Sequence, residues 1–137
     1  MSNLTLKPPP IADPLESYHQ EQVFYMAHLH KKQYPELQHL FAVPNGGFRH
    51  KATAEAMKRQ GVKRGVPDVC LPLARGGYCG WWGELKRFDG VPSDLSTEQK
   101  EWLALLTDEG YFATWHKGWE AMWKSLLWYI SLPPNQP

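Results

Sequence analysis

Apolar residues recur along this chain with two periods, and each period predicts a different kind of element. Spacings of three or four residues are typical of a helix with one buried face, whereas alternation or a short apolar run is typical of a strand. The first pattern predicts helices over about 15–32, 51–60, 96–109 and 119–130. The second predicts strands over about 40–43, 68–73, 84–86 and 111–116. This order indicates an α/β fold in which helices flank a small mixed β-sheet.

The apolar positions within these elements predict the core. The run LFAV at 40–43 is short and apolar throughout, which indicates a buried strand. The helix over 51–60 is expected to turn its few apolar side chains inward. The helical residues expected to be buried are Val23, Met26, Ala27 and His30, then Ala52, Ala56 and Met57, then Trp102, Leu103, Leu105 and Leu106, and finally Trp119, Met122, Trp123, Leu126, Leu127 and Ile130.

Glycines and one capping sequence mark where elements end. Gly61 follows the second helix at the position where a left-handed residue commonly ends a helix. Gly76-Gly77 predicts a turn between the second and third strands. Ser96-Thr97-Glu98-Gln99 is a capping box, in which the side chains of Ser96 and Gln99 each bind the other residue's backbone N–H.

The length of 137 residues is that of one domain. We expect a flexible proline-rich lead-in at 1–14, one domain over 15–132 and a short tail at 133–137. The sequence has no run of about 18 apolar residues and no signal-peptide pattern, so we expect a cytoplasmic protein without a membrane partner. In that setting Cys70 and Cys79 are expected to be free thiols, and no cysteine or histidine spacing suggests zinc.

Candidate chemistry gathers between residues 65 and 87. A Pro67-Asp68 pair precedes the Gly76-Gly77 turn, and the triplet Glu84-Leu85-Lys86 follows it. If the two strands pair, Asp68 can lie beside Glu84, and Lys86 shares the face of Glu84 because strand side chains alternate. Two carboxylates and an ammonium suit a hard divalent cation and an attacking water. The simpler alternative is a surface ion pair between Glu84 and Lys86.

These residues resemble the motif of the PD-(D/E)XK nuclease superfamily, and further blocks resemble its virus-type replication-repair nuclease (VRR-NUC) family. The similarity covers about residues 18 to 131, and it rests on an ordered set of motifs. They are Val43-Pro44-Asn45-Gly46-Gly47, Gly61-Val62-Lys63 with Gly65-Val66-Pro67-Asp68, Glu84-Leu85-Lys86, Ser96 with Glu98-Gln99, and Gly110-Tyr111 with Gly118-Trp119. The resemblance implies a restriction-endonuclease-like core and a metal-dependent DNA endonuclease, linked to phage replication, recombination or repair. It also implies one or two Mg²⁺ or Mn²⁺ ions held by Asp68, Glu84 and the Leu85 carbonyl.

The resemblance assigns roles to residues outside the central motif as well. Lys86 would orient or deprotonate the attacking water, or stabilise charge on the phosphate, and Gln99 would lie near the site. The family also supplies a glutamate from the first helix, but that position here falls on Tyr18. Glu21 is the preferred replacement, and Glu16 is the alternative.

The distribution of charge suggests a nucleic-acid partner although the net charge is only +1. Residues 45 to 64 hold six basic residues against one acidic residue. Placed just before Asp68, such a segment is suited to a phosphate backbone, although a solvated helix face would look the same. The residues expected to contact DNA are Asn45, Gly46, Gly47, Arg49, His50, Lys51, Lys63 and Arg64. Trp82 is the one aromatic residue expected near substrate, because it shares the face of Glu84.

Three functions are compatible with these patterns. The first is a structure-selective DNA endonuclease acting on branched, flapped or four-way-junction DNA, for which a homodimer would match the symmetry of a junction. The second is a non-catalytic nucleic-acid-binding module that keeps the nuclease fold. The third is an enzyme acting on RNA or a nucleotide. No nucleotide cofactor is expected, and a phage-encoded protein would act inside the bacterial host cell.

Overall fold

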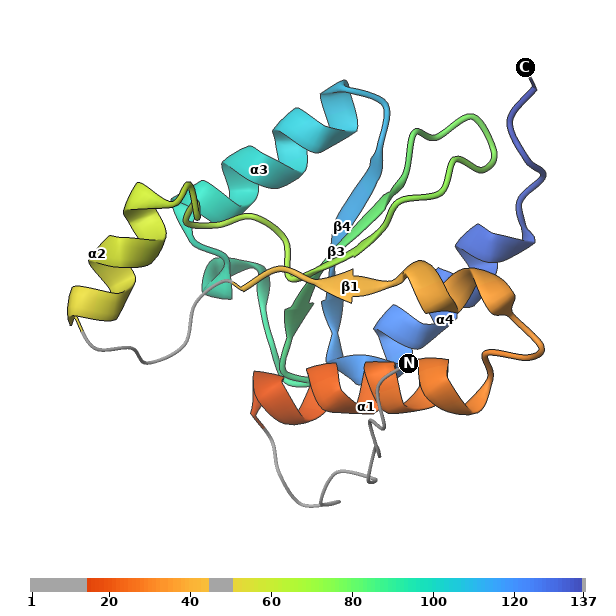
Figure 1. The fold of residues 1–137 in the computed structure, drawn as a ribbon, viewed down its shortest axis with the longest axis horizontal. Helices are drawn as coiled ribbons and strands as arrows, with labels where there is room; N and C mark the ends of the chain where they lie inside the picture. The colour runs from red at the N-terminus through yellow and green to blue at the C-terminus, as the bar shows by residue number, and fades with distance from the viewer. Residues whose placement is uncertain (1–14, 45–50, 137) are drawn as a thin grey trace.

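The structure is a computed structural model that describes residues 15–44 and 51–136. The expected lead-in at 1–14 and the loop residues Asn45, Gly46, Gly47, Arg49 and His50 therefore lie outside the described residues. Four α-helices, two short 3₁₀ helices (η) and four strands follow one another in the described part (Figure 1). In chain order they are α1 (Glu16–Leu29), η1 (Pro35–His39), β1 (Phe41–Ala42), α2 (Lys51–Arg59), β2 (Val69–Leu71), β3 (Trp81–Lys86), η2 (Pro92–Asp94), α3 (Thr97–Asp108), β4 (Phe112–Lys117) and α4 (Gly118–Ser131).

The strands form one mixed sheet in the order β1-β2-β3-β4. β1 and β2 pair antiparallel, as do β2 and β3, whereas β3 and β4 run parallel. The connection from β3 to β4 passes through α3, because parallel neighbours need a crossover. This arrangement confirms the expected α/β fold with a small mixed sheet between helices.

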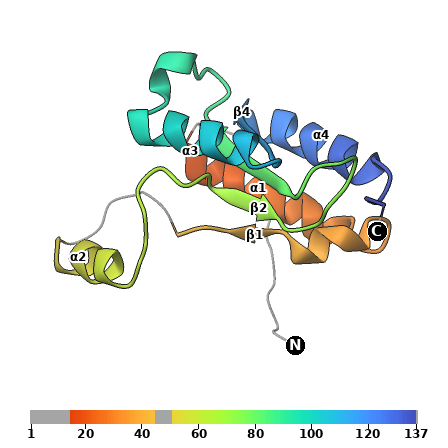
Figure 2. The ribbon, with the colours of Figure 1, turned by 90° about the horizontal axis from the view of Figure 1, so that it is seen from above.

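Helices cover both faces of the sheet (Figures 1 and 2). On one face α4 contacts β3 and β4 and packs along α1. Trp81 points to this side, where its Nε1 donates to the Ser125 hydroxyl at 3.0 Å. A Cβ at Gly83 would overlap the Trp81 ring and the Met122 side chain, so this strand position can hold only glycine. On the other face α3 contacts β4.

The expected turns and part of the expected core are confirmed. Gly61, Gly76 and Gly77 all have positive φ. The buried core includes six of the residues that the helical spacings predicted: Val23, Ala27, Leu106, Met122, Trp123 and Leu126. Both cysteines are free, with Cys70 buried and Cys79 exposed. In the described part of the chain, no helix combines the length and apolar character needed to cross a bilayer.

Four expectations about packing are wrong, and each error has a physical reason. The first helix ends at Leu29, where turns leading to η1 replace its expected last residues. Within LFAV, Leu40 is buried as expected, but the strand itself is a two-residue edge strand, because β1 pairs only with β2 and leaves Phe41 44% exposed. Leu105 is 49% exposed, since α3 turns Leu106 toward the sheet. No residue of α2 is buried, so its apolar side chains do not join the core.

Candidate active site

The register of β2 and β3 brings Asp68 opposite Glu84. The last pair in this ladder is Val69 with Gly83, and one step further along both strands lie Asp68 and Glu84. Residues directly opposed in an antiparallel pair project from the same face. The Asp68 side chain also bonds to the neighbouring strand, because its Oδ2 accepts a hydrogen bond from the Leu85 N–H at 2.7 Å. The Asp68 carboxylate is therefore fixed in position at the end of the hairpin.

Glu84 is the most deeply buried charged residue of this region. It is 1% exposed, and its Oε2 accepts a hydrogen bond from Nε2 of Gln99 at 3.0 Å. Its other oxygen, Oε1, is buried and accepts no hydrogen bond from a donor among the described residues, although the Glu84 and Asp68 carboxyl groups also interact with each other. A buried acceptor without a donor is rare in native proteins, and an ion is one explanation for it.

Lys86 lies two residues beyond Glu84 with its side chain only 9% exposed. Its Nζ is 4.0 Å from Oε2 of Glu84 and 3.9 Å from Oε2 of Glu16 on α1. Glu84 and Lys86 are thus buried together, and the alternative of an ion pair on the open surface is wrong. The ammonium lies between carboxylates from two different elements.

Burial gives the two carboxyl groups unusual acidities. Burial is the main reason that the pKa of Glu84 rises to about 9, and the adjacent Asp68 carboxyl raises it further. Burial also raises the pKa of Asp68, against the opposing effects of its contacts with Glu84 and the Leu85 amide. Like carboxyl groups in a buried site favour the protonated form, which a bound cation would reverse.

Gln99 has both of the roles that the sequence left open. Its Oε1 accepts from the Ser96 N–H at 2.8 Å, and its backbone N–H donates to the Ser96 hydroxyl at 3.1 Å, so the capping box is present. Gly65, with φ of +88°, holds this end of α3 close to the chain that leads into Asp68. A Cβ there would lie 2.6 Å from Cβ of Glu98. The conformation of Gly65 therefore permits the close approach of the two motifs.

The first helix brings Glu16, rather than Glu21, to the candidate site. Glu16 forms the ion pair with Lys86, and burial raises its pKa. Glu21 is exposed and takes part in none of the ion pairs found among the described residues. Five residues along a helix correspond to a rotation of about 140°, so the two side chains face different directions. Tyr18 is half-buried between them.

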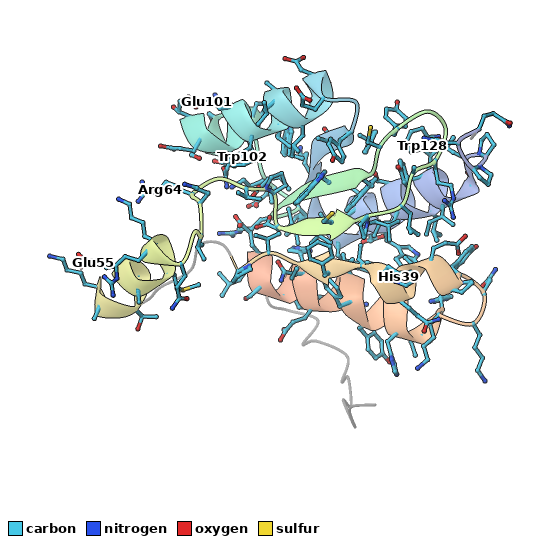
Figure 3. All side chains as sticks on the ribbon, turned by 45° about the horizontal axis from the view of Figure 1, so that its top comes forward. His39, Glu55, Arg64, Glu101, Trp102 and Trp128 are labelled. Carbon is cyan, nitrogen blue, oxygen red and sulfur yellow. The ribbon has the colours of Figure 1, made fainter. Side chains whose placement is uncertain are left out.

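The described residues expected to contact DNA all lie at the surface. Lys51, Lys63 and Arg64 are exposed, and Figure 3 shows Arg64 in the segment between α2 and the rest of the molecule. The α2 helix itself stands apart from the sheet in Figures 1 and 2. Trp82 lies on the same face of β3 as Glu84 and is half-buried.

A cavity of about 450 Å³ opens beside Lys86. Its lining combines α1 with the segment that follows β3, and consists of Glu16, Lys86, Arg87, Asp89, Val91 and Asp94. The sequence did not predict that the last four of these residues would lie at the site. The available signal was their position directly after the Glu84-Leu85-Lys86 triplet.

The carboxylate pair is compatible with a hard divalent cation. Among the described residues, no cluster of three or more histidine, cysteine, aspartate or glutamate side chains has metal-binding geometry. Mg²⁺, however, commonly binds through one or two carboxylates together with waters and substrate phosphates. Asp68 and Glu84 supply that number, and Oε1 of Glu84 has no hydrogen-bond donor among the described residues.

This chain is similar in fold and sequence to a solved structure. Neither the protein-family models nor the curated proteins give a match to this chain. A solved structure described as a VRR_NUC domain protein has 28% sequence identity and a TM-score of 0.75, and the match covers 92% of this chain and 96% of that one. This agreement in fold and sequence, together with the motifs around Asp68 and Glu84, supports the expected resemblance to the VRR-NUC family.

Proposed function

We propose that this chain is a divalent-metal-dependent DNA endonuclease that hydrolyses phosphodiester bonds. The observation that carries the proposal is the meeting of Asp68 and Glu84 in a buried corner beside Lys86, with one Glu84 oxygen lacking a hydrogen-bond donor among the described residues. The resemblance to a nuclease family supports the same reaction class. Buried carboxylates in this arrangement are costly unless a cation offsets their charge.

In this proposal Asp68, Glu84 and the backbone carbonyl of Leu85 hold one or two Mg²⁺ or Mn²⁺ ions. A bound ion of this type lowers the pKa of a water and offsets charge on the phosphate. The Leu85 N–H fixes Asp68, and the Gln99 amide fixes Glu84, so both carboxylates are oriented before any ligand arrives. Such orientation by neighbouring hydrogen bonds is typical of metal sites.

Lys86 supplies the positive charge of the site in this proposal. Its ammonium is held between Glu84 and Glu16, so it can donate to the attacking water or to a non-bridging phosphate oxygen. Glu16 keeps Lys86 in place, which gives the first helix a part in the site. Glu21, the carboxylate preferred on sequence grounds, forms none of the ion pairs among the described residues, so it is the weaker candidate for that part.

We infer that the substrate is branched or duplex DNA in phage replication, recombination or repair, with the protein acting as a homodimer in the cytoplasm of a bacterial host. The exposed cations Lys51, Lys63 and Arg64 support a phosphate-binding surface. The proposed surface also includes Asn45, Gly46, Gly47, Arg49 and His50. Contacts of this kind set position along a backbone and do not read sequence.

Cleavage of labelled DNA tests the proposal. Four-way junction, flap, plain duplex and RNA of matched sequence would be incubated with Mg²⁺, Mn²⁺ or chelator. We expect Asp68→Ala to lower the rate by about a hundredfold or more, since changes in outer-shell partners alone lower metal-site activity by 10–100-fold. Asp108→Ala is the matched control, because this aspartate is exposed at the end of α3.

Two observations favour a second candidate, a binding module without catalysis. Tyr18 occupies the first-helix position at which the family has glutamate, and the described residues hold no cluster of three metal-binding side chains. That candidate predicts DNA binding in chelator and no product with any metal. Cleavage by the unaltered protein that is lost in Asp68→Ala would exclude it.

A further inference from the structure

The cavity beside Lys86 extends beyond the atoms that the proposed hydrolysis uses. Lys86 and Glu16 form one side of it, and the segment after β3 forms the other. Its volume of about 450 Å³ lies within the 300–1,000 Å³ range of small-ligand sites. A chain of DNA with one phosphate at Lys86 would place its neighbouring nucleotide within or beside this cavity.

The charges of the lining favour a neutral ligand with hydrogen-bond donors. Three carboxylates, on Glu16, Asp89 and Asp94, face two cations. Arg87 is already engaged, with its Nε 3.6 Å from Oδ1 of Asp89. A second phosphate would therefore meet net negative charge. Exocyclic amino groups of bases, by contrast, donate readily to aspartate and glutamate.

Exposed apolar side chains lie on, and next in sequence to, the segments that line the cavity. The described residues include seven large hydrophobic side chains that are exposed, and three of them belong to this region. Val91 lines the cavity and is 47% exposed, Leu15 precedes Glu16 and is 54% exposed, and Phe88 follows Arg87 and is 64% exposed. Phe88 is the most exposed of the seven, and its two neighbours in the sequence, Arg87 and Asp89, both line the cavity.

The backbone of Phe88 is closely packed, whereas its side chain is exposed. A Cβ on Gly118, which has φ of +80°, would lie 3.2 Å from the Phe88 Cβ, so the backbone at Phe88 packs closely on the start of α4. The ring centroid lies 6.4 Å from that of His19 on α1. An aromatic ring held this way presents a stacking surface with little loss of conformational entropy on binding.

We propose that Phe88 and the cavity beside Lys86 form a subsite for one unpaired nucleobase of the strand being cut. The base stacks on the Phe88 ring, and its amino groups donate to the carboxylates of the lining, among them Asp89, whose side chain is 58% exposed. A base within a duplex is already stacked and paired, so the subsite favours DNA with an unpaired segment at the cleavage point. This inference rests on the proposed function, because it takes the phosphate to lie at Lys86.

Binding without metal separates this proposal from the question of catalysis. Two labelled duplexes with a single-stranded extension would be compared in chelator, one with normal nucleotides in the extension and one with abasic residues. We expect Phe88→Ala to weaken binding of the normal DNA by about 5-fold to 150-fold, the range observed when one aromatic stacking partner is removed. It should leave binding of the abasic DNA unchanged, and Phe88→Trp should retain the wild-type affinity.

Leu29→Ala is the matched control. Leu29 is a 54% exposed hydrophobic residue at the far end of α1, about 20 Å from Glu16 at 1.5 Å per residue. We expect no change in either affinity. Equal losses on normal and abasic DNA, or no loss on either, would overturn the base subsite. A fall in molar mass by light scattering in Phe88→Ala would overturn it too, because a second copy of the chain would then cover the ring.

The two proposals fail in different ways. If no metal supports cleavage but Phe88→Ala still discriminates between normal and abasic DNA, hydrolysis is refuted and the base subsite stands. If Mg²⁺-dependent cleavage is present and Phe88→Ala cuts and binds as the wild type does, the subsite is refuted and hydrolysis stands.

Discussion

Gln99 donates a hydrogen bond from its Nε2 to Oε2 of Glu84 at 3.0 Å, across the gap between α3 and β3. The same amide accepts from the Ser96 N–H through its Oε1 at 2.8 Å. Because the cap engages the oxygen, the nitrogen must face the carboxyl group. The start of α3 thereby determines the orientation of a proposed metal ligand on the sheet.

Gln99→Glu should separate these two roles. A glutamate keeps the acceptor for Ser96 and is the usual partner in a capping box, but it cannot donate to Glu84. We expect cleavage to fall by about 10-fold to 100-fold, the usual effect of losing an outer-shell partner. The free energy of unfolding in chelator should fall by about 1–3 kcal/mol, because the buried Glu84 carboxyl loses its donor. Initial rates and urea unfolding measure the two quantities.

Ser96→Ala is the opposite control. It removes the hydroxyl that accepts from the Gln99 N–H and leaves the bond between Gln99 and Glu84 in place. We expect a loss of about 0.5–2 kcal/mol of stability and unchanged cleavage well below the melting temperature. If Gln99→Glu behaves like Ser96→Ala, the amide acts only as a cap.

Glu84→Gln should stabilise the metal-free protein and abolish its activity. The folded-state pKa of Glu84, about 9, lies above the ordinary value of 4.5. The stability linked to this carboxyl is therefore fully present below pH 4.5 and is lost as the pH rises toward 9. Glutamine does not titrate, so at pH 8 in chelator we expect a melting temperature higher by several degrees, because about 1 kcal/mol shifts it by roughly 2–8 °C.

Added Mg²⁺ should make the melting temperature of the wild type higher than that of Glu84→Gln. Binding to the folded state alone raises the melting temperature of the wild type, and it releases a proton from Glu84. Glu84→Gln should show a smaller Mg²⁺-induced shift and no cleavage. Thermal unfolding at pH 6 and pH 8, with and without MgCl₂, measures these shifts. Identical Mg²⁺ shifts in the two proteins would remove Glu84 from the proposed ligands.

The sequence predicted the central geometry because that geometry is local. Strand alternation, a Gly76-Gly77 turn and antiparallel pairing are sufficient to set Asp68 opposite Glu84. The capping box could also be predicted from the sequence, since its four residues are consecutive. Both features depend on short-range rules that tertiary contacts reinforce and do not override.

Other features depended on which neighbours an element has, which periodicity does not reveal. LFAV resembles a central strand, yet β1 lies at the sheet edge and leaves Phe41 exposed. The second helix has apolar side chains, yet none of its residues reaches the core. The choice between Glu16 and Glu21 depended on the angle at which α1 crosses the end of β3, and the cavity beside Lys86 depended on the path of a loop.

Glu16→Gln and Glu21→Gln form a matched pair on α1. Of these two glutamates, only Glu16 forms an ion pair with Lys86, at 3.9 Å, so its removal frees the ammonium on one side. We expect Glu16→Gln to lower the cleavage rate by about 10-fold to 100-fold, as for other positioning partners. Glu21→Gln should stay within about twofold of the wild type, a difference of about 0.4 kcal/mol in the barrier. Reversal of this order in Mg²⁺ kinetics would restore Glu21 as the carboxylate from the first helix.

Lys63 and Arg64 provide a test of the phosphate-binding surface by salt dependence. Both are exposed and lie between α2 and the Pro67-Asp68 motif. If each neutralises one phosphate, the double change Lys63→Gln with Arg64→Gln should reduce the slope of log affinity against log salt by about 1.8, because each contact contributes about 0.9. Lys31→Gln with Lys32→Gln removes two exposed charges just beyond the far end of α1 and should leave the slope unchanged. Binding of duplex DNA by fluorescence anisotropy in chelator, over a series of salt concentrations, measures both slopes. Equal slopes in the two double variants would show that the affinity reflects overall charge and not a defined surface beside Asp68.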